Sequence, residues 1–113
     1  HKAELQRSNF TGADLSGVDM SKGDFLRTLF VDANLSDVDL SKSNIARTDL
    51  SGAKLNGVNL KNAFMYRTNI AGADLANTKN LDQVQLDMAC GNAETILPEG
   101  FTRPAKWPCN GEE

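Results

Sequence analysis

The two cysteines, Cys90 and Cys109, are the side chains of this 113-residue chain whose type and spacing best suit chemistry. Such a pair can remain as free thiols in a cytoplasmic protein or form a disulfide in an oxidising compartment. We favour the disulfide, because the segment between the cysteines holds all three prolines, and an irregular segment gains most from a covalent link. Closing a loop of about 20 residues stabilises by about 3 kcal/mol in the entropic model. The pair therefore predicts a periplasmic or lumenal protein whose leader has been removed, with a cytoplasmic location as the alternative.

Other reactive side chains form no catalytic constellation. The single histidine is His1, distant in sequence from both cysteines, so a tetrahedral metal site is not expected. Ser, Asp and Lys recur as outward positions of a repeat, where we interpret the aspartates as solvated surface rather than as catalytic groups. The glycines fit tight turns and form no phosphate-binding loop. We expect no enzyme activity, no cofactor, no metal and no small-molecule substrate.

Arginines recur at intervals of twenty residues, at Arg7, Arg27, Arg47 and Arg67. A chain that returns to the same place every twenty residues would stack them in a column with about 4.8 Å between steps. Like charges at this spacing repel unless carboxylates, water or an anion intervene. Glu4, Asp24 and Asp49 lie near enough in the repeat to share the charge. The alternative interpretation is a solvated ladder whose long stems pack over the surface.

Apolar residues occupy outward positions beside this column. They are Leu26, Leu29, Phe64 and Tyr66, which a twenty-residue winding places on one side of the coil and its adjoining corner. An aromatic and aliphatic patch flanked by arginine has the composition of a protein-binding surface. Incidental exposure, or weak self-association of an otherwise monomeric protein, explains the same residues equally well. The sequence thus suggests a protein partner that it does not identify.

The elements that must position these side chains follow a period of five. From residue 5 to residue 75 every fifth residue is bulky and apolar, and a small or β-branched residue stands two positions before each. A period of five is neither the 3.6 of a helix nor the two of a strand. The small residue is Ala at 13, 33, 53 and 73, Val at 18, 38 and 58, and Thr at 28, 48 and 68, so equivalent positions return every twenty residues. Four pentads therefore make one turn of a square coil whose turns stack through parallel backbone hydrogen bonds.

The units ANLSD, ADLSG, AKLNG and ADLAN, at residues 33–37, 13–17, 53–57 and 73–77, resemble the A(D/N)LXX unit of the pentapeptide-repeat proteins. The resemblance covers residues 3 to about 79. It implies an all-β fold, a right-handed quadrilateral parallel β-helix of about four coils. The family includes gyrase-protecting DNA mimics as well as regulatory and effector proteins, so the resemblance implies a non-enzymatic scaffold or protein-interaction module, with a DNA-mimicking inhibitor of a type II topoisomerase as the alternative.

Charge argues against the DNA mimic. Through residue 79 the chain carries ten basic and nine acidic residues, about +1, and the rest carries −4, which gives the net charge of −3. Duplex DNA carries about one negative charge per 1.7 Å, so a coil about 19 Å long would need about eleven. We therefore rank gyrase protection below a generic interaction role, and expect no binding of nucleic acid.

The five-residue register fails after Lys79. Leu81, Val84 and Met88 then recur at helical spacing, Asp82 and Gln85 fit a capping box, and Gly91 is placed to stop a helix. The sequence predicts a β-helix over residues 1–80 and a cap over 81–113, made of a helix at about 82–90 and an irregular tail. The N-terminal coil has no such cap, which suggests a missing segment or a partner. No apolar run is long enough to span a membrane.

Overall fold

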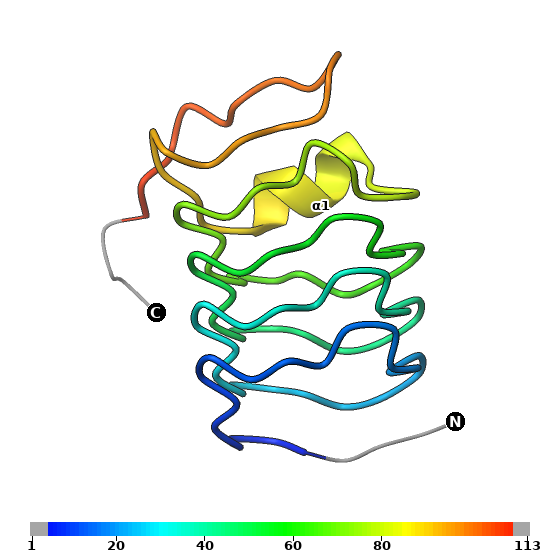
Figure 1. The fold of residues 1–113 in the computed structure, drawn as a ribbon. Helices are drawn as coiled ribbons and strands as arrows, with labels where there is room; N and C mark the ends of the chain where they lie inside the picture. The colour runs from blue at the N-terminus through cyan, green and yellow to red at the C-terminus, as the bar shows by residue number, and fades with distance from the viewer. Residues whose placement is uncertain (1–4, 110–113) are drawn as a thin grey trace.

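A stack of coils forms the body of the protein in the computed structural model, which describes residues 5–109 (Figure 1). Parallel bridges join residues twenty positions apart in the pentads, and 21 or 22 apart beyond them, in four rows that give each coil four sides. We name the sides after one bridged residue of each: the Phe64 side (with 24 and 44), the Leu29 side (9, 49, 69 and 90), the Lys54 side (14, 34, 74 and 96) and the Asn59 side (19, 39 and 79). In this order around the coil, the Phe64 and Lys54 sides are opposite each other. The expected β-structure consists of these isolated bridges, without continuous strands in residues 5–109, because two of every five residues form a turn.

From residue 6 to residue 72, each corner of the coil is a tight turn whose second residue has a left-handed backbone. Glycine occupies some of these positions, for example Gly17 with φ 76° and Gly57 with φ 80°. Other corners hold L-residues such as Asp32 and Asp37, with φ 57° and 62°. A left-handed backbone costs an ordinary L-residue about 1–2 kcal/mol, and glycine avoids this cost. The corner glycines expected from the sequence thus lie where the backbone requires them.

The aspartates before the central residues are exposed or half-buried, as expected for solvated surface, and they also stabilise these corners. The carboxylate of Asp19 accepts hydrogen bonds from the backbone N–H (2.9 Å) and the hydroxyl (2.7 Å) of Ser21, two residues on. The same backbone bond forms at Asp14, Asp39, Asp49 and Asp74. Such Asx turns hold the chain in its bend. These positions therefore do structural work that their exposure alone does not reveal.

The core is a set of ladders made by the central residues. Phe25, Leu35, Ile45 and Leu75 have no exposed surface, and the small Ala33 beside them is fully buried. Three buried threonines add a polar ladder: the hydroxyl of Thr68 donates to the carbonyl of Ile45 at 2.6 Å, and Thr28 and Thr48 make equivalent bonds to the preceding coil. These hydroxyls thus bond backbone carbonyls and not one another.

The helix α1 spans Gln83–Met88 and is shorter than the predicted 82–90. Asp82 and Gln85 form the predicted capping box, but the residue that stops the helix is its C-cap Ala89, in extended backbone, and not Gly91. The side chain of Gln85 also points into the coil, where its amide donates to the carbonyls of Leu60 (2.8 Å) and Ala63 (3.0 Å). The helix is therefore attached to the end of the coil by the hydrogen bonds of Gln85.

Beyond α1 the chain returns to the coil, which the sequence did not predict. Cys90 bridges Asn69 and Ile96 bridges Asp74, at spacings of 21 and 22 residues. Thr95 donates to the carbonyl of Ile70 at 2.9 Å, which repeats the role of the threonine ladder. Two sides of one more coil therefore stand above the pentads, and the remaining tail, orange to red in Figure 1, lies beyond them.

Side-chain contacts hold the tail on this last coil. The indole of Trp107 donates to the carbonyl of Ala89 at 2.9 Å, and the guanidinium of Arg103 donates to the carbonyls of Asn92 (2.6 Å) and Thr95 (2.9 Å). Gln83 exchanges two hydrogen bonds with the backbone of Thr102. Phe101 and Trp107 pack against the core, as expected for a cap. At the other end of the stack Leu5 and Val18 are 36% and 43% exposed.

None of the helices found among residues 5–109 has the length and apolar character needed to cross a membrane.

Candidate interaction surface

The four arginines lie at one corner, between the Phe64 and Leu29 sides, and we call them the Arg column. Each occupies the left-handed turn position, with φ between 52° and 60°. Consecutive coils pair here through the backbone, with Arg27 N–H donating to Ala46 at 3.2 Å and Arg47 N–H donating to Tyr66 at 2.9 Å. Arg7 and Arg27 are exposed, whereas Arg47 and Arg67 are half-buried. The column is thus continuous along the stack, and its N-terminal half is the more accessible.

The carboxylates expected to share this charge are engaged elsewhere. Asp24 accepts from the amides of Gln6 (2.9 Å) and Asn44 (3.4 Å), and Asp49 accepts from Ser51. Glu4, like His1, lies outside the described residues. Within residues 5–109, the guanidinium groups of Arg7 and Arg27 form no ion pair or hydrogen bond. Among the described residues, no contacting carboxylate therefore neutralises their charge.

An aromatic pair marks the C-terminal end of the same surface. The rings of Phe64 and Tyr66 stack with centroids 6.4 Å apart and planes at 15°, and the residues are 49% and 42% exposed. The guanidinium carbon of Arg47 lies 5.3 Å from the centroid of the Tyr66 ring, which is cation–π distance. Two large apolar side chains and a cation thus form one ordered cluster on the surface.

The two leucines predicted beside this pair lie further along the corner. Leu26 stands two coils from Tyr66, with the buried Ala46 between them, and it is half-buried. Leu29 lies on the next side and is 38% exposed. The structure therefore divides the predicted patch into the aromatic pair with Arg47, and a Leu26–Arg27–Leu29 group about 10 Å away at two coil spacings.

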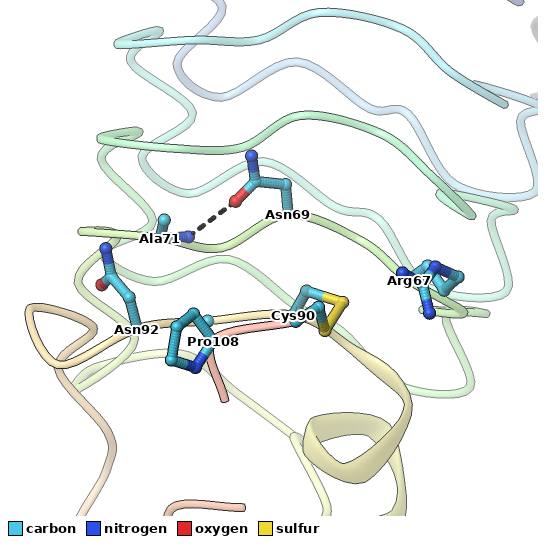
Figure 2. Close-up of a pocket in the computed structure, with 8 residues that line it drawn as sticks. Arg67, Asn69, Ala71, Cys90, Asn92 and Pro108 are labelled. Atoms are coloured by element: carbon cyan, nitrogen blue, oxygen red, sulfur yellow. Dashed lines mark hydrogen bonds between the residues drawn. A yellow bond between two sulfur atoms is a disulfide. The ribbon is translucent and has the colours of Figure 1, made fainter. Parts of the chain in front are cut away.

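The disulfide joins Cys90 to Cys109, with 5.6 Å between their Cα atoms, and borders a cleft of about 320 Å³ (Figure 2). Arg67, Asn69, Ala71 and Asn92 line the cleft together with Pro108. Asn69 is held by the backbone N–H of Ala71, 3.0 Å from its Oδ1. The disulfide links Cys109, at the end of the described tail, to Cys90, which directly follows α1 and its C-cap Ala89.

The described residues show no arrangement typical of a catalytic or metal site. No group of three or more His, Cys, Asp or Glu side chains among residues 5–109 is placed to hold a metal ion. The pKa of Asp14 is lowered chiefly by the backbone hydrogen bond from Ser16, and that of Asp19 chiefly by the hydroxyl of Ser21. Both carboxylates are exposed Asx-turn acceptors, so their lowered pKa values have a structural cause.

The chain matches the family model described as pentapeptide repeats, in eight copies, at residues 1–30, 8–47, 33–70 and 48–79. The chain belongs to the pentapeptide-repeat family. Solved structures agree: HetL, a pentapeptide repeat protein involved in heterocyst differentiation regulation from the cyanobacterium Nostoc sp. strain PCC 7120, is 32% identical with a TM-score of 0.63. That match covers 65% of this chain and 31% of HetL, so the present repeat chain spans about a third of its relative.

Other pentapeptide repeat structures are less similar. Rfr23 from the cyanobacterium Cyanothece 51142 is 15% identical over 84% of this chain and 88% of its own, with a TM-score of 0.48. A protein from the Arabidopsis thaliana thylakoid lumen is 24% identical over 80% of this chain and 64% of its own, with a TM-score of 0.31. A comparison with curated protein sequences found no match.

Several structural residues were missed at the sequence level. The Asx-turn aspartates carry a visible signal, because serine often follows two positions later, as Ser16 follows Asp14 and Ser21 follows Asp19. The sequence identifies Gln85 as a capping residue, but its spacing does not predict that its side chain also donates hydrogen bonds to carbonyls of the coil. Arg103 has no sequence signal, since its acceptors are backbone carbonyls of the tail.

Proposed function

We propose that this pentapeptide-repeat protein is a non-enzymatic scaffold or interaction module that binds a protein partner through the Arg column and the aromatic pair. The observation that carries the proposal is the ordered, exposed stack of Phe64 and Tyr66 with Arg47 over the Tyr66 ring. Aromatic and arginine side chains are enriched in protein interfaces and dominate their binding energy. A pair that is already stacked loses little conformational freedom on binding, which favours affinity.

We do not propose a second function. The topoisomerase-inhibitor alternative requires an acidic surface that imitates DNA, and the repeats carry about +1. An assay of purified gyrase tests this ranking directly, since potent inhibition or protection by this protein would reverse it.

We further propose a right-handed winding of the coil and an oxidising compartment, a periplasm or lumen. Parallel strand connections are right-handed in nearly all proteins. Disulfides such as Cys90–Cys109 persist chiefly outside the reducing cytosol. Such a location restricts the partner to exported or lumenal proteins.

The interaction surface is tested by affinity capture from an extract of the native compartment. The Phe64→Ala/Tyr66→Ala variant should lose the partner that the intact protein retains. Ile96→Ala is a matched control, because Ile96 is 50% exposed, like Phe64 at 49%, but lies on the opposite Lys54 side. Equal recovery by the double variant and the intact protein, with both folded by circular dichroism, would remove the surface from consideration.

A further inference from the structure

We propose that the partner docks through an acidic, amphipathic segment whose apolar residues lie on Phe64 and Tyr66 and whose carboxylates meet the N-terminal half of the Arg column. This inference rests on the proposed function and adds the chemistry of the partner. It commits to a polypeptide with alternating acidic and apolar character.

The charge of the surface supports the acidic part. Arg7 and Arg27 are exposed, and within residues 5–109 no carboxylate pairs with their guanidinium groups. Asp24, an acidic residue on the adjoining side, accepts hydrogen bonds from the amides of Gln6 and Asn44. The backbones of Arg7 and Arg27 are one coil step apart, about 4.8 Å, and two like charges on adjacent steps repel each other. A carboxylate placed between them attracts both guanidinium groups and also offsets their repulsion. Guanidinium groups also bind carboxylates bidentately, which fixes orientation.

The distribution of apolar surface supports the amphipathic part. Leu26 and Leu29 flank Arg27, and the aromatic pair lies about 10 Å further along the stack. The four coil levels of the column span about 14 Å, roughly the length of ten helical residues or four extended ones. In a helical segment, alternating carboxylates and apolar side chains both occur on one face, at positions i, i+3, i+4 and i+7, so such a segment matches this surface along its whole length.

Nucleic acid fits the same surface less well. The phosphates of a duplex would contact the arginines, but its bases are stacked inside the helix and offer no apolar group to Phe64 or to Leu29. The protein as a whole carries −3, with the acidic excess in the C-terminal segment, and this field disfavours a polyanion of uniform charge. A helical segment with a carboxylate at every second residue carries about one charge per 3 Å, against about one per 1.7 Å in a duplex, and it supplies apolar groups as well.

The experiment uses the full, disulfide-bonded chain and a fluorescein-labelled peptide in which Glu and Leu alternate around one central Trp. Binding is measured by fluorescence anisotropy at two salt concentrations, against a peptide with Gln in place of Glu and another with Ser in place of Leu. We expect the parent peptide to bind more tightly than both, and added salt to weaken it. Equal binding of the Gln peptide, or equally effective competition by a duplex oligonucleotide, overturns the proposal.

Variants locate the site. Arg27→Gln should weaken binding of the peptide about threefold and Arg7→Gln/Arg27→Gln about tenfold, as expected for exposed ion pairs. Phe64→Ala should weaken binding about thirtyfold, because Phe64 is an anchor residue of the interface. Lys54→Gln removes the same charge from the opposite side and should leave binding unchanged. If Arg27→Gln binds like the parent, the acidic assignment is wrong. Should the peptide fail while native capture still depends on Phe64 and Tyr66, the interaction module stands and only the partner chemistry falls.

Discussion

Asp37 and Gly57 occupy equivalent corners of successive coils, and Oδ1 of Asp37 fills the space that a Cβ on Gly57 would need. Asp32 stands over Gly52 in the same way. Gly17 has a similar left-handed backbone, φ 76° against 80° at Gly57, but no atom lies within 4 Å of its Cβ position. The two glycines therefore separate the cost of backbone strain from the cost of crowding.

Replacing each glycine with alanine measures these costs. Gly17→Ala should lower the free energy of unfolding by about 1 kcal/mol through its backbone alone. Gly57→Ala should cost about 1 kcal/mol more, because the carboxylate of Asp37 must move away. Denaturant unfolding of both variants provides the comparison. In a double-mutant cycle, Asp37→Gly should remove the extra cost, and a strictly additive cycle would contradict the contact.

The threonine ladder gives the second prediction. Thr68→Val keeps the buried shape but removes the hydroxyl that donates to the Ile45 carbonyl, and should cost about 1–2 kcal/mol. Thr68→Ser keeps the bond and loses one methyl group, so it should cost about 1 kcal/mol. Hydrogen exchange should show the loss at the coil that contains Ile45. An unchanged stability of Thr68→Val would mean that the hydrogen bond contributes nothing net.

These corners and ladders follow from the sequence because each pentad repeats the same local chemistry. A bulky residue, a small residue two before it and a turn residue two after it specify one side, and identity every twenty residues places Thr28, Thr48 and Thr68 in line. The pattern could not announce that the coil continues through Cys90 and Ile96. There the spacing becomes 21 and 22 residues, since α1 replaces part of a turn, and a fixed period no longer detects the equivalence.

The sequence predicts which residues of the candidate surface share a column, but it does not predict how exposed each side chain is. The twenty-residue period places Leu26 and Tyr66 in one column, yet the exposed fraction of each depends on its neighbours in the stack. The side chain of Leu26 is half-buried, whereas that of Tyr66 is exposed and stacks on Phe64. Side-chain packing across coils decides this difference, and no spacing rule encodes it.

Acid should weaken the corners, which is the third prediction. The pKa of Asp19 lies below its ordinary 3.8, chiefly because the Ser21 hydroxyl donates to the charged carboxylate. A carboxylate with a lowered folded-state pKa adds stability above the unfolded-state pKa, and this stability is lost as pH falls through the folded-state pKa. Stability should therefore decline below about pH 3.8. Carboxyl-carbon NMR titration should show the pKa of Asp19 rising in Ser21→Ala, and no change there would contradict the stated cause.

The fourth prediction concerns Gly91, where a Cβ would lie 2.6 Å from the Trp107 ring and 2.8 Å from the Thr95 hydroxyl. Gly91→Ala should displace the indole and break its hydrogen bond to Ala89, with a cost of about 2 kcal/mol. Trp107 is the only tryptophan, so its fluorescence should shift to the red as the ring becomes exposed. Gly100→Ala, in the same tail, adds backbone strain at φ +92° but meets no neighbouring atom, so it should leave the emission unchanged. An unshifted spectrum for Gly91→Ala would show that the tail adjusts without losing its packing.

The last prediction concerns the disulfide and links the compartment to stability. Cys90 and Cys109 are separated by 19 residues, and the entropic model assigns about 3 kcal/mol to closing such a loop. Reduction should loosen residues 91–109 first and leave the inner coils protected, because each coil is stabilised by its neighbours. Hydrogen exchange of oxidised and reduced protein measures this order directly. Loss of the tail would uncover the last backbone edge at Cys90 and Ile96, so the reduced protein should also associate more readily.

The Cys90→Ser/Cys109→Ser variant controls for any effect of the reductant and should reproduce the loosened tail. Mass spectrometry of protein alkylated without reduction, taken from its native compartment, then decides whether the bond forms there. Two alkylated thiols would overturn both the disulfide and the proposed oxidising location. A protein in which reduction opened the inner coils as early as the tail would instead place the disulfide in the folding unit of the repeats, against the neighbour-dependent stability that the coil geometry implies.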